Sequence, residues 1–345
     1  MKKPIVSIII LNYNGKKWLE KCLPTIKKLK YEPLEVLVVN NGSSDDSGAY
    51  VRKNFPQFRL IEIKKNRGFA GGNNIGVKKA KGKYVLLLNN DTEVDPNFIG
   101  PLVERMENDP SIGCVQPELR SMVHKNLIDS IGSFFTFTGF LYHYGYFQQH
   151  KKKQYQNELS VYSVKGACCM LKRSDYLYLG GLDEDFVCYV EESDLCHRIL
   201  LSGKKIVYVP NSFIHHFGGG DMSIMEKNET TAFRSVRNRF YSYIKNFSLL
   251  ELIKILPVLF VLSEVLIVVT ILRGKIRNAI AAQWGIIWCI LYLPKILKKR
   301  KYVQEKIRRV SDSHFLPEIT KNPPFSYYVH FVTNPEGKYL EKPIS

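Results

Sequence analysis

Tyr84-Val85-Leu86-Leu87-Leu88-Asn89-Asn90-Asp91-Thr92-Glu93 is the stretch that decides the fold of this 345-residue chain. An apolar run of strand length ends in amides and acids, and a buried strand that presents carboxylates at its C-terminal end is typical of an open α/β sheet. Asp91 and Glu93 lie two residues apart, so in extended backbone their side chains point to the same side. Two such oxygens suit Mg²⁺ or Mn²⁺ bound to a diphosphate. A polar turn, with Asp91 as a helix cap before Pro96, is the alternative interpretation.

Strand and helix patterns alternate around this stretch. Continuous apolar runs predict buried strands, and apolar residues at helical spacing predict helices. The predicted elements are strands at 6–11, 34–39, 60–63 and 84–88 and helices at 18–29, 73–80 and 97–108. Repeated strand–helix units predict a mainly parallel α/β sheet with right-handed crossovers. A ligand then lies beyond the strand ends, where Asn12, Asn40 and Asp91 fall.

The charge and the cysteines limit the class of protein. The formal net charge is +18, from 50 Lys and Arg against 32 Asp and Glu, which indicates an anionic partner. Seven cysteines without a C-x-x-C pair argue against a disulfide framework or a zinc site and fit a reducing cytosol. The N-terminal Lys2-Lys3 and the short apolar run that follows resemble a signal peptide, but no small-residue cleavage site follows, so we interpret the run as the first strand.

A glycine-rich stretch at 66–74 precedes a predicted helix. Gly68, Gly71 and Gly72 allow close backbone approach, and free N–H groups at the helix start favour an anion. The stretch is not the G-x-G-x-x-G fingerprint, which disfavours a dinucleotide-binding dehydrogenase. A flexible turn is the alternative interpretation.

Four blocks together carry a resemblance to a known family. They are VSIIILNYNG at 6–15, VVNNGSSD at 38–45, GFAGGNN at 68–74 and NDTE at 90–93. In this order they resemble the family 2 glycosyltransferases, and within that family the rhamnosyltransferase-type members, over most of the first 245 residues. The resemblance implies a GT-A fold, a nucleotide-sugar donor and a divalent metal, Mg²⁺ or Mn²⁺.

The resemblance also implies roles on the donor side. Tyr13 lies against the base, and Asn40 stands where the family usually has Asp, so this position offers a donor as well as acceptors. Asp91 matches the first acid of the metal and ribose motif, and Glu93 matches its third position. The implied nucleotide-sugar contacts are Asn12, Tyr13, Asn14, Asn40, Gly68, Gly71, Gly72, Asn73, Asn74, Asn90 and Asp91.

An acidic segment, Glu191-Glu192-Ser193-Asp194-Leu195, resembles the family's Glu-Asp-x-Asp-Leu pattern. The second position of that pattern is the family's usual general base, which an inverting transfer needs to deprotonate the acceptor hydroxyl. Glu192 takes that place here, and Asp194 is the second catalytic candidate. An acid-rich helix start that complements the helix dipole is the alternative interpretation.

The block Ile214-His215-His216-Phe217-Gly218-Gly219-Gly220 resembles the family's His-x-Gly-Gly-Gly block. It makes His216 a third metal ligand beside Asp91 and Glu93, with His215 as the alternate. Three arginines on the next predicted helix, Arg234, Arg237 and Arg239, either contact an acceptor pyrophosphate or form a solvated basic face.

Two apolar stretches, 255–272 and 279–293, follow this region. The first contains Pro257 and Glu264, and the second is short for a span, which needs about 20 residues. Between Arg273 and Arg309 there are eleven basic residues and one acid. We expect two interfacial or re-entrant helices at the cytoplasmic face of the cell membrane, with the basic tail on anionic headgroups. A two-helix span is the second choice, and a soluble helical cap is the third.

The sequence therefore predicts a glycosyltransferase domain at 1–245, with a nucleotide-sugar half at 1–112 and an acceptor half at 113–245. Membrane-associated helices at 246–310 and a tail at 311–345 follow. The expected activity is inverting transfer from dTDP-rhamnose or another nucleoside-diphosphate sugar to a glycan or polyprenyl-diphosphate-linked acceptor, in cell-surface polysaccharide synthesis.

Two other functions, a sugar-nucleotide pyrophosphorylase and a nucleic-acid-binding protein, fit the sequence less well. A sugar-nucleotide pyrophosphorylase needs a basic glycine-rich loop after the first strand, which residues 12–16 do not supply. A nucleic-acid-binding protein is disfavoured because the basic residues gather beside the apolar tail instead of over the sheet domain.

Overall fold

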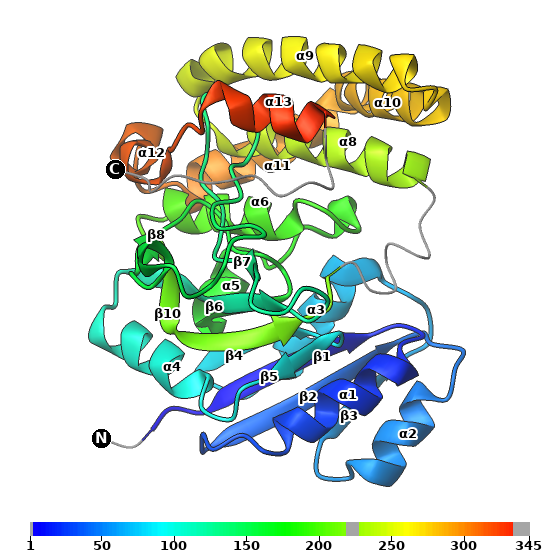
Figure 1. Ribbon diagram of the computed structural model, residues 1–345, viewed down its shortest axis with the longest axis vertical. Coiled ribbons are helices and arrows are strands. Elements are labelled where there is room, and N and C mark those ends of the chain that lie inside the picture. The colour runs from blue at the N-terminus through cyan, green and yellow to red at the C-terminus, as the bar shows by residue number, and fades with distance from the viewer. Residues whose placement is uncertain (1–2, 219–227, 334–345) are drawn as a thin grey trace.

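The computed structural model describes residues 3–218 and 228–333. Its centre is one mixed sheet with the strand order β3-β2-β1-β4-β9-β6-β10-β5, to which β7 and β8 add at the side (Figure 1). The strands are β1 (Val6–Asn12), β2 (Leu34–Asn41), β3 (Arg59–Ile63), β4 (Tyr84–Asn89), β5 (Thr92–Val94), β6 (Ile112–Ser121), β7 (Ile128–Ser130), β8 (Leu159–Ser160), β9 (Cys168–Lys172) and β10 (Lys205–His216).

The first four strands form one parallel block of the sheet, and β6 pairs in parallel with β10. β1 pairs in parallel with both β2 and β4, and its register sets Asn12 beside Asn40 and Leu11 beside Asn89. The carboxyl ends of β1, β2 and β4 therefore meet at one edge, as the sequence predicts. The repeated strand–helix pattern ends there, because β9 pairs antiparallel with β4 and β5 pairs antiparallel with β10.

Helices cover both faces of the sheet. One apolar core contains side chains of α1 and α4, and a second contains side chains of α3, α6 and the helices after residue 228. The α-helices are α1 (Lys16–Ile26), α2 (Ser47–Asn54), α3 (Gly68–Lys79), α4 (Ile99–Asn108), α5 (Arg173–Tyr178), α6 (Glu191–Leu201), α8 (Asn228–Asn246), α9 (Leu249–Leu272), α10 (Ile276–Leu291), α11 (Leu293–Tyr302), α12 (Asp312–Ile319) and α13 (Phe325–Thr333). Short turns are η1 (Lys153–Tyr155), η2 (Glu184–Phe186) and the π-helical η3 (Val303–Ile307).

Helix α3 begins at Gly68, earlier than the predicted start at residue 73, so most of the predicted glycine-rich loop is helical. The reason is close packing of α3 on β1. A Cβ atom at Gly72 would lie 2.3 Å from Leu11 Cδ1, and one at Gly76 would lie 2.4 Å from Ile9 Cγ2. These glycines are needed to let the helix approach the strand.

The C-terminal helices lie at the end of the molecule opposite β1, β2 and β3 (Figure 1). α9 has 24 residues and exposes many large apolar side chains, among them Leu250 and Val261. Within residues 3–218 and 228–333, α9 is the single helix that is long and apolar enough to cross a membrane by itself. α10 passes the same test only together with α11 and η3, across a bend of 65°.

The segment expected as a tail is folded as far as it is described. Phe315 and Ile319 of α12 are buried, and Tyr327 of α13 is buried as well. The Phe135 amide donates to the Ile319 carbonyl at 3.0 Å. Residues 312–333 therefore pack on the aromatic segment that precedes β8, a contact that apolar spacing alone did not indicate.

Candidate active site

Three asparagines meet at the carboxyl edge of β1, β2 and β4. Asn90 Nδ2 donates to Asn12 Oδ1 at 2.8 Å, and Asn12 Nδ2 donates to Asn40 Oδ1 at 3.3 Å. Asn12 and Asn40 are buried, whereas Tyr13 is half-buried in the loop after β1. Asn14 supports the opposite loop, because its Oδ1 accepts from the Ser44 amide at 2.7 Å. The parallel register thus assembles this part of the predicted donor site.

A hydrogen bond to Glu62 explains why position 40 is asparagine and not aspartate. Its Nδ2 donates to Glu62 Oε2 at 2.9 Å, and its Oδ1 accepts from Ser43 Oγ at 2.5 Å. Glu62 also pairs with Arg52 at 2.8 Å. An aspartate at position 40 would place a second carboxylate against Glu62, so the departure from the family pattern has a local physical reason.

The start of α3 offers fewer free groups than the sequence predicts. The Gly68 amide donates to Asn66 Oδ1 at 2.8 Å, and the Phe69 amide donates to the Val187 carbonyl at 3.0 Å. The expectation of free N–H groups is therefore wrong for these two amides.

Further along α3, two predicted contacts have interior partners. Asn73 Nδ2 donates to the Phe69 carbonyl at 3.0 Å, and Asn74 Oδ1 accepts from Tyr176 Oη at 2.6 Å. Gly72 faces Leu11, and a Cβ at Gly71 would meet Arg67 Cβ at 2.9 Å. These positions shape the packing of α3 against its neighbours.

Asp91 lies directly after β4, beside the end of β10. It is buried, and its carbonyl accepts from the Phe217 amide at 3.0 Å. His216 Nε2 lies 3.4 Å from Asp91 Oδ1, and His216 Nδ1 lies 2.8 Å from Asp129 Oδ2. Lys165 Nζ forms a 2.7 Å ion pair with Asp129, so the contacts run in series from Asp91 through His216 and Asp129 to Lys165.

The two carboxylates hold His216 in its charged form. Burial lowers the pKa of His216, but the hydrogen bonds to Asp129 and Asp91 outweigh this and raise the pKa to about 9. Burial raises the pKa of Asp129, but Lys165 and His216 outweigh it and lower the pKa to about 2. Asp129 and Lys165 were missed in the sequence, because neither lies in a recognisable motif.

Part of this site suits a divalent metal. Asp91 Oδ1 is buried and, apart from the ion pair with His216 Nε2 at 3.4 Å, has no partner that meets hydrogen-bond geometry among the described residues, which suits a hard cation. The rest of the expected triad is not assembled. In the antiparallel pairing of β5 with β10, Glu93 lies opposite His215 and Thr92 lies opposite His216. Because successive side chains of a strand point to opposite faces of the sheet, Glu93 and His216 lie on different faces. No three His, Cys, Asp or Glu side chains within residues 3–218 and 228–333 are grouped as a metal site. The residues fit a metal held mainly by Asp91 and by ligands from outside the chain.

Glu192 lies in the first turn of α6. Burial raises the pKa of this carboxyl, while backbone hydrogen bonds, including one from Gly166, and the Lys165 charge oppose the shift. A Cβ at Gly166 would lie 3.8 Å from Glu192 Cδ and 3.6 Å from Phe69 Cζ. Glu192 therefore lies beside Gly166, the residue after Lys165, and the Lys165 charge links it electrostatically to the contacts among Asp129, His216 and Asp91.

Asp194 lies two residues further along α6 and is fully buried. Its Oδ2 pairs with Arg198 at 2.9 Å and with Lys245 at 2.8 Å. Its Oδ1 accepts from Ser242 at 3.1 Å and from Asn246 at 2.8 Å. Both oxygens are occupied, so the structure speaks against the catalytic role predicted for Asp194 and favours a structural one.

The arginines of α8 also face the interior. Arg237 donates to the Asp185 carbonyl at 2.9 Å and lies 4.9 Å from the centre of the Trp288 ring. The Arg239 guanidinium lies 4.4 Å from the centre of the Phe140 ring, and Arg234 donates to Cys188 Sγ at 3.0 Å. Gly219 and Gly220 of the histidine block lie outside the described residues.

The sheet with its strand-end acids and amides defines an α/β enzyme of the glycosyltransferase type. The profile of the Glycosyl transferase family 2 matches residues 7–180, half of the chain, and the chain belongs to this family. The fold is GT-A, as predicted, whereas the rhamnosyltransferase-type subgroup is not shown.

Curated relatives and solved structures agree with this assignment. Poly-beta-1,6-N-acetyl-D-glucosamine synthase of Staphylococcus aureus is 26% identical over 207 residues, which are 59% of this chain and 48% of that protein. The chain spans about half the length of the curated relatives it matches.

Two solved structures illustrate the shared fold. GalNAc-T7 with UDP, GalNAc and Mn²⁺ aligns with a TM-score of 0.57 and 17% identity, over 71% of this chain and 48% of that one. The mannosyltransferase PcManGT from Pyrobaculum calidifontis, in complex with GDP-Man and Mn²⁺, aligns with a TM-score of 0.51 and 17% identity, over 88% of this chain and 86% of that one.

Proposed function

We propose that this chain is an inverting glycosyltransferase that moves a sugar from a nucleoside-diphosphate donor to a hydroxyl of a glycan or lipid-linked saccharide in cell-surface polysaccharide synthesis. One observation carries the proposal: a series of contacts runs from Asp91 through His216 and Asp129 to Lys165, whose positive charge lowers the pKa of Glu192. The series places a donor-side acid and a candidate base around one site, as a single displacement requires.

Glu192 acts as the general base in this proposal. It takes the proton from the acceptor hydroxyl as that oxygen forms a bond to the anomeric carbon, while the bond from that carbon to the diphosphate oxygen breaks on the opposite side. The raised pKa of the half-buried Glu192 carboxyl supports this role, because it makes the carboxylate a stronger base. The bonds to both oxygens of Asp194 support Glu192 over Asp194 as the base.

Asp91 binds the donor side of the reaction. Its Oδ1, which makes no hydrogen bond among the described residues and has His216 Nε2 at 3.4 Å, is the atom that would hold Mg²⁺ or Mn²⁺, and the metal would neutralise the leaving diphosphate. His216 fixes the Asp91 carboxylate by the ion pair at 3.4 Å. Asn12, Asn40 and Asn90 line the nucleotide end, with Tyr13 and Gly68 as further predicted contacts.

The helical end of the molecule supports an acceptor at a membrane. α9 exposes apolar side chains such as Leu250 and Val261, and α11 carries exposed basic residues such as Lys298. α9 lies along the helical layer formed with α8 and α10 (Figure 1), which favours an interfacial position over a projecting span. We place this surface on anionic headgroups at the cytoplasmic face, with a polyprenyl-diphosphate-linked acceptor.

The donor can be identified with a panel of nucleotide sugars. We expect one of UDP-N-acetylglucosamine, GDP-mannose or dTDP-rhamnose, with Mn²⁺, to raise the midpoint of thermal unfolding, because a ligand that binds only the folded state stabilises it. Asp91→Ala should lose the shift that wild-type protein shows. If no nucleotide sugar or nucleoside diphosphate in a wider panel shifts the midpoint, the donor class is wrong.

A further inference from the structure

The loop that leads into α6 has an unusual backbone. Val187, Tyr189 and Val190 have φ angles of 64°, 68° and 72°. This left-handed region is unfavourable for residues with a Cβ atom, and most of all for β-branched valines. Such a path persists only where surrounding contacts impose it. The loop ends two residues before Glu192, so whatever imposes the path also bears on the proposed base.

One buried side chain of α8 supplies three of those contacts. Asn238 Nδ2 donates to three carbonyls of the loop: Phe186 at 3.1 Å, Cys188 at 2.9 Å and Tyr189 at 2.7 Å. Asn238 is fully buried. Arg237 Nε donates to Asn238 Oδ1 at 2.8 Å, which fixes the amide so that its NH₂ group faces the loop.

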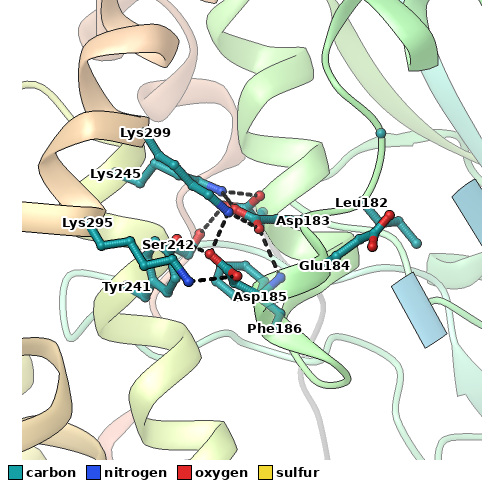
Figure 2. Close-up of polar contacts among 12 residues, drawn as sticks. Leu182, Asp183, Glu184, Asp185, Phe186, Tyr241, Ser242, Lys245, Lys295 and Lys299 are labelled. Carbon is teal, nitrogen blue, oxygen red and sulfur yellow. Dashed lines mark hydrogen bonds and ion pairs between the residues drawn. The ribbon is translucent and has the colours of Figure 1, made fainter. Parts of the chain in front are cut away.

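The segment before the loop is held by its side chains. Asp183 pairs with Lys245 at 2.7 Å and Asp185 pairs with Lys295 at 2.9 Å, while Lys299 pairs with both acids (Figure 2). No ion pair of this group involves a residue after Asp185. From residue 186 onward Asn238 contacts three loop carbonyls, while Arg237 also donates to the Phe186 carbonyl at 3.3 Å and the Phe69 amide donates to the Val187 carbonyl at 3.0 Å.

No capping side chain fixes the start of α6. Val190 occupies the N-cap position with left-handed backbone and makes no side-chain capping hydrogen bond. Ser, Thr, Asp or Asn would normally fix such a helix start. The bonds of Asp194 hold the end of the first turn, and a backbone hydrogen bond from Gly166 contacts the Glu192 carboxyl; the path of residues 186–190 sets how the chain enters the helix just before Glu192.

We propose that Asn238, oriented by Arg237, is a positioning residue for Glu192. By holding residues 186–190 in their left-handed path, it sets the first turn of α6 and aims the Glu192 carboxyl at the acceptor hydroxyl. The inference rests on the proposed base role of Glu192, but it assigns Asn238 a function that neither the fold nor the family match gives it.

Asn238→Asp tests the inference, because it keeps the shape of the side chain and removes the NH₂ donors. With the panel sugar that turns over among UDP-N-acetylglucosamine, GDP-mannose and dTDP-rhamnose, we expect kcat to fall about a hundredfold, as a small misplacement of a reacting group can do. The donor KM should change little, because Asn238 does not touch Asn12, Asn40 or Asp91. Amide hydrogen exchange at residues 186–190 should become faster.

Two further variants separate positioning from folding. Tyr243→Phe is the matched control, since it removes another buried hydrogen bond of α8, the one from Tyr243 Oη to the Gly139 carbonyl at 2.6 Å, without touching the loop or α6; its kcat should stay near wild type. Val190→Gly, combined with Asn238→Asp, removes the strain at a positive φ and should restore the folded state if Asn238→Asp alone unfolds. Its kcat should stay low, because the loop is no longer held.

The outcomes distinguish this inference from the proposed function. A folded Asn238→Asp protein, alone or with Val190→Gly, that shows wild-type kcat and unchanged exchange at 186–190 overturns the positioning role. If Glu192→Gln is inactive in the same assay, the base assignment stands regardless. A fully active Glu192→Gln protein refutes the base assignment itself, and with it the reason for positioning.

Discussion

Asn40 is a single residue whose identity the structure explains. Its NH₂ group donates to the Glu62 carboxylate at 2.9 Å. Asn40→Asp should lower the free energy of unfolding by about 1–3 kcal/mol, because it replaces a hydrogen bond by two facing acids. Urea denaturation measures the change. Adding Glu62→Gln should recover most of the loss, and a double variant as unstable as Asn40→Asp would contradict the explanation.

His197 should make stability depend on pH. It is fully buried beside Tyr162, Phe247 and Phe315, and burial lowers its pKa from 6.5 to about 3. His197 therefore binds a proton near pH 6.5 in the unfolded chain, but only near pH 3 in the folded chain. The stabilisation is present above the unfolded pKa and is lost as the pH falls through this window, at up to about 1.4 kcal/mol per pH unit.

The test compares unfolding free energies at pH 7 and pH 5. His197→Phe should reduce the loss of stability between the two values, while the exposed His314→Gln should leave the loss as in wild type. Equal losses in wild type and His197→Phe would show that His197 is not the group responsible.

Residues in ordered motifs were easier to place from the sequence than residues joined only by the fold. Asp91 and Glu192 lie in blocks that resemble the family's motifs. Asp129 reaches His216 because β7 pairs with β6, which is itself paired with β10. No local pattern marks that pairing, so neither Asp129 nor its partner Lys165 could be predicted.

At the scale of elements, the sequence predicts β1–β4 and α1 well for a physical reason. Strands covered on both faces read as continuous apolar runs, and α1 has a clear apolar stripe. The start of α3 was misplaced because glycine normally indicates a turn, whereas here it allows helix and strand to touch. The antiparallel β5 and β9 are set by tertiary pairing, which periodicity does not reveal.

Gly76 tests that explanation of α3. A Cβ at Gly76 would lie 2.4 Å from Ile9 Cγ2, so Gly76→Ala should destabilise the fold by about 1–3 kcal/mol through overpacking. Gly100 of α4 is the matched control, because a Cβ there meets nothing within 4 Å. Gly100→Ala should be neutral or stabilise by up to about 1 kcal/mol, since alanine favours the helix. Equal effects of both changes in urea denaturation would refute the packing argument.

At the scale of the whole molecule, we expect the sheet end and the helical end to contact different partners. The carboxyl edge of β1, β2 and β4 faces a nucleotide sugar, while α9 and α11 face anionic lipid. We expect vesicles that contain phosphatidylglycerol to co-sediment the protein, high salt to release it, and vesicles of phosphatidylcholine to bind it less. Protein from cell membranes that resists both high salt and carbonate would show that α9 spans the bilayer instead.

The central claim is that Glu192 removes the proton from the acceptor hydroxyl. The most direct measurement is the rate of sugar transfer by Glu192→Gln, which keeps the shape of the side chain but cannot accept the proton. Glu158→Gln is the control, because it makes the same change in a surface ion pair with Arg105. We predict a loss of about 10²–10⁴-fold in kcat for Glu192→Gln and none for Glu158→Gln. Transfer by Glu192→Gln at the wild-type rate would contradict the account.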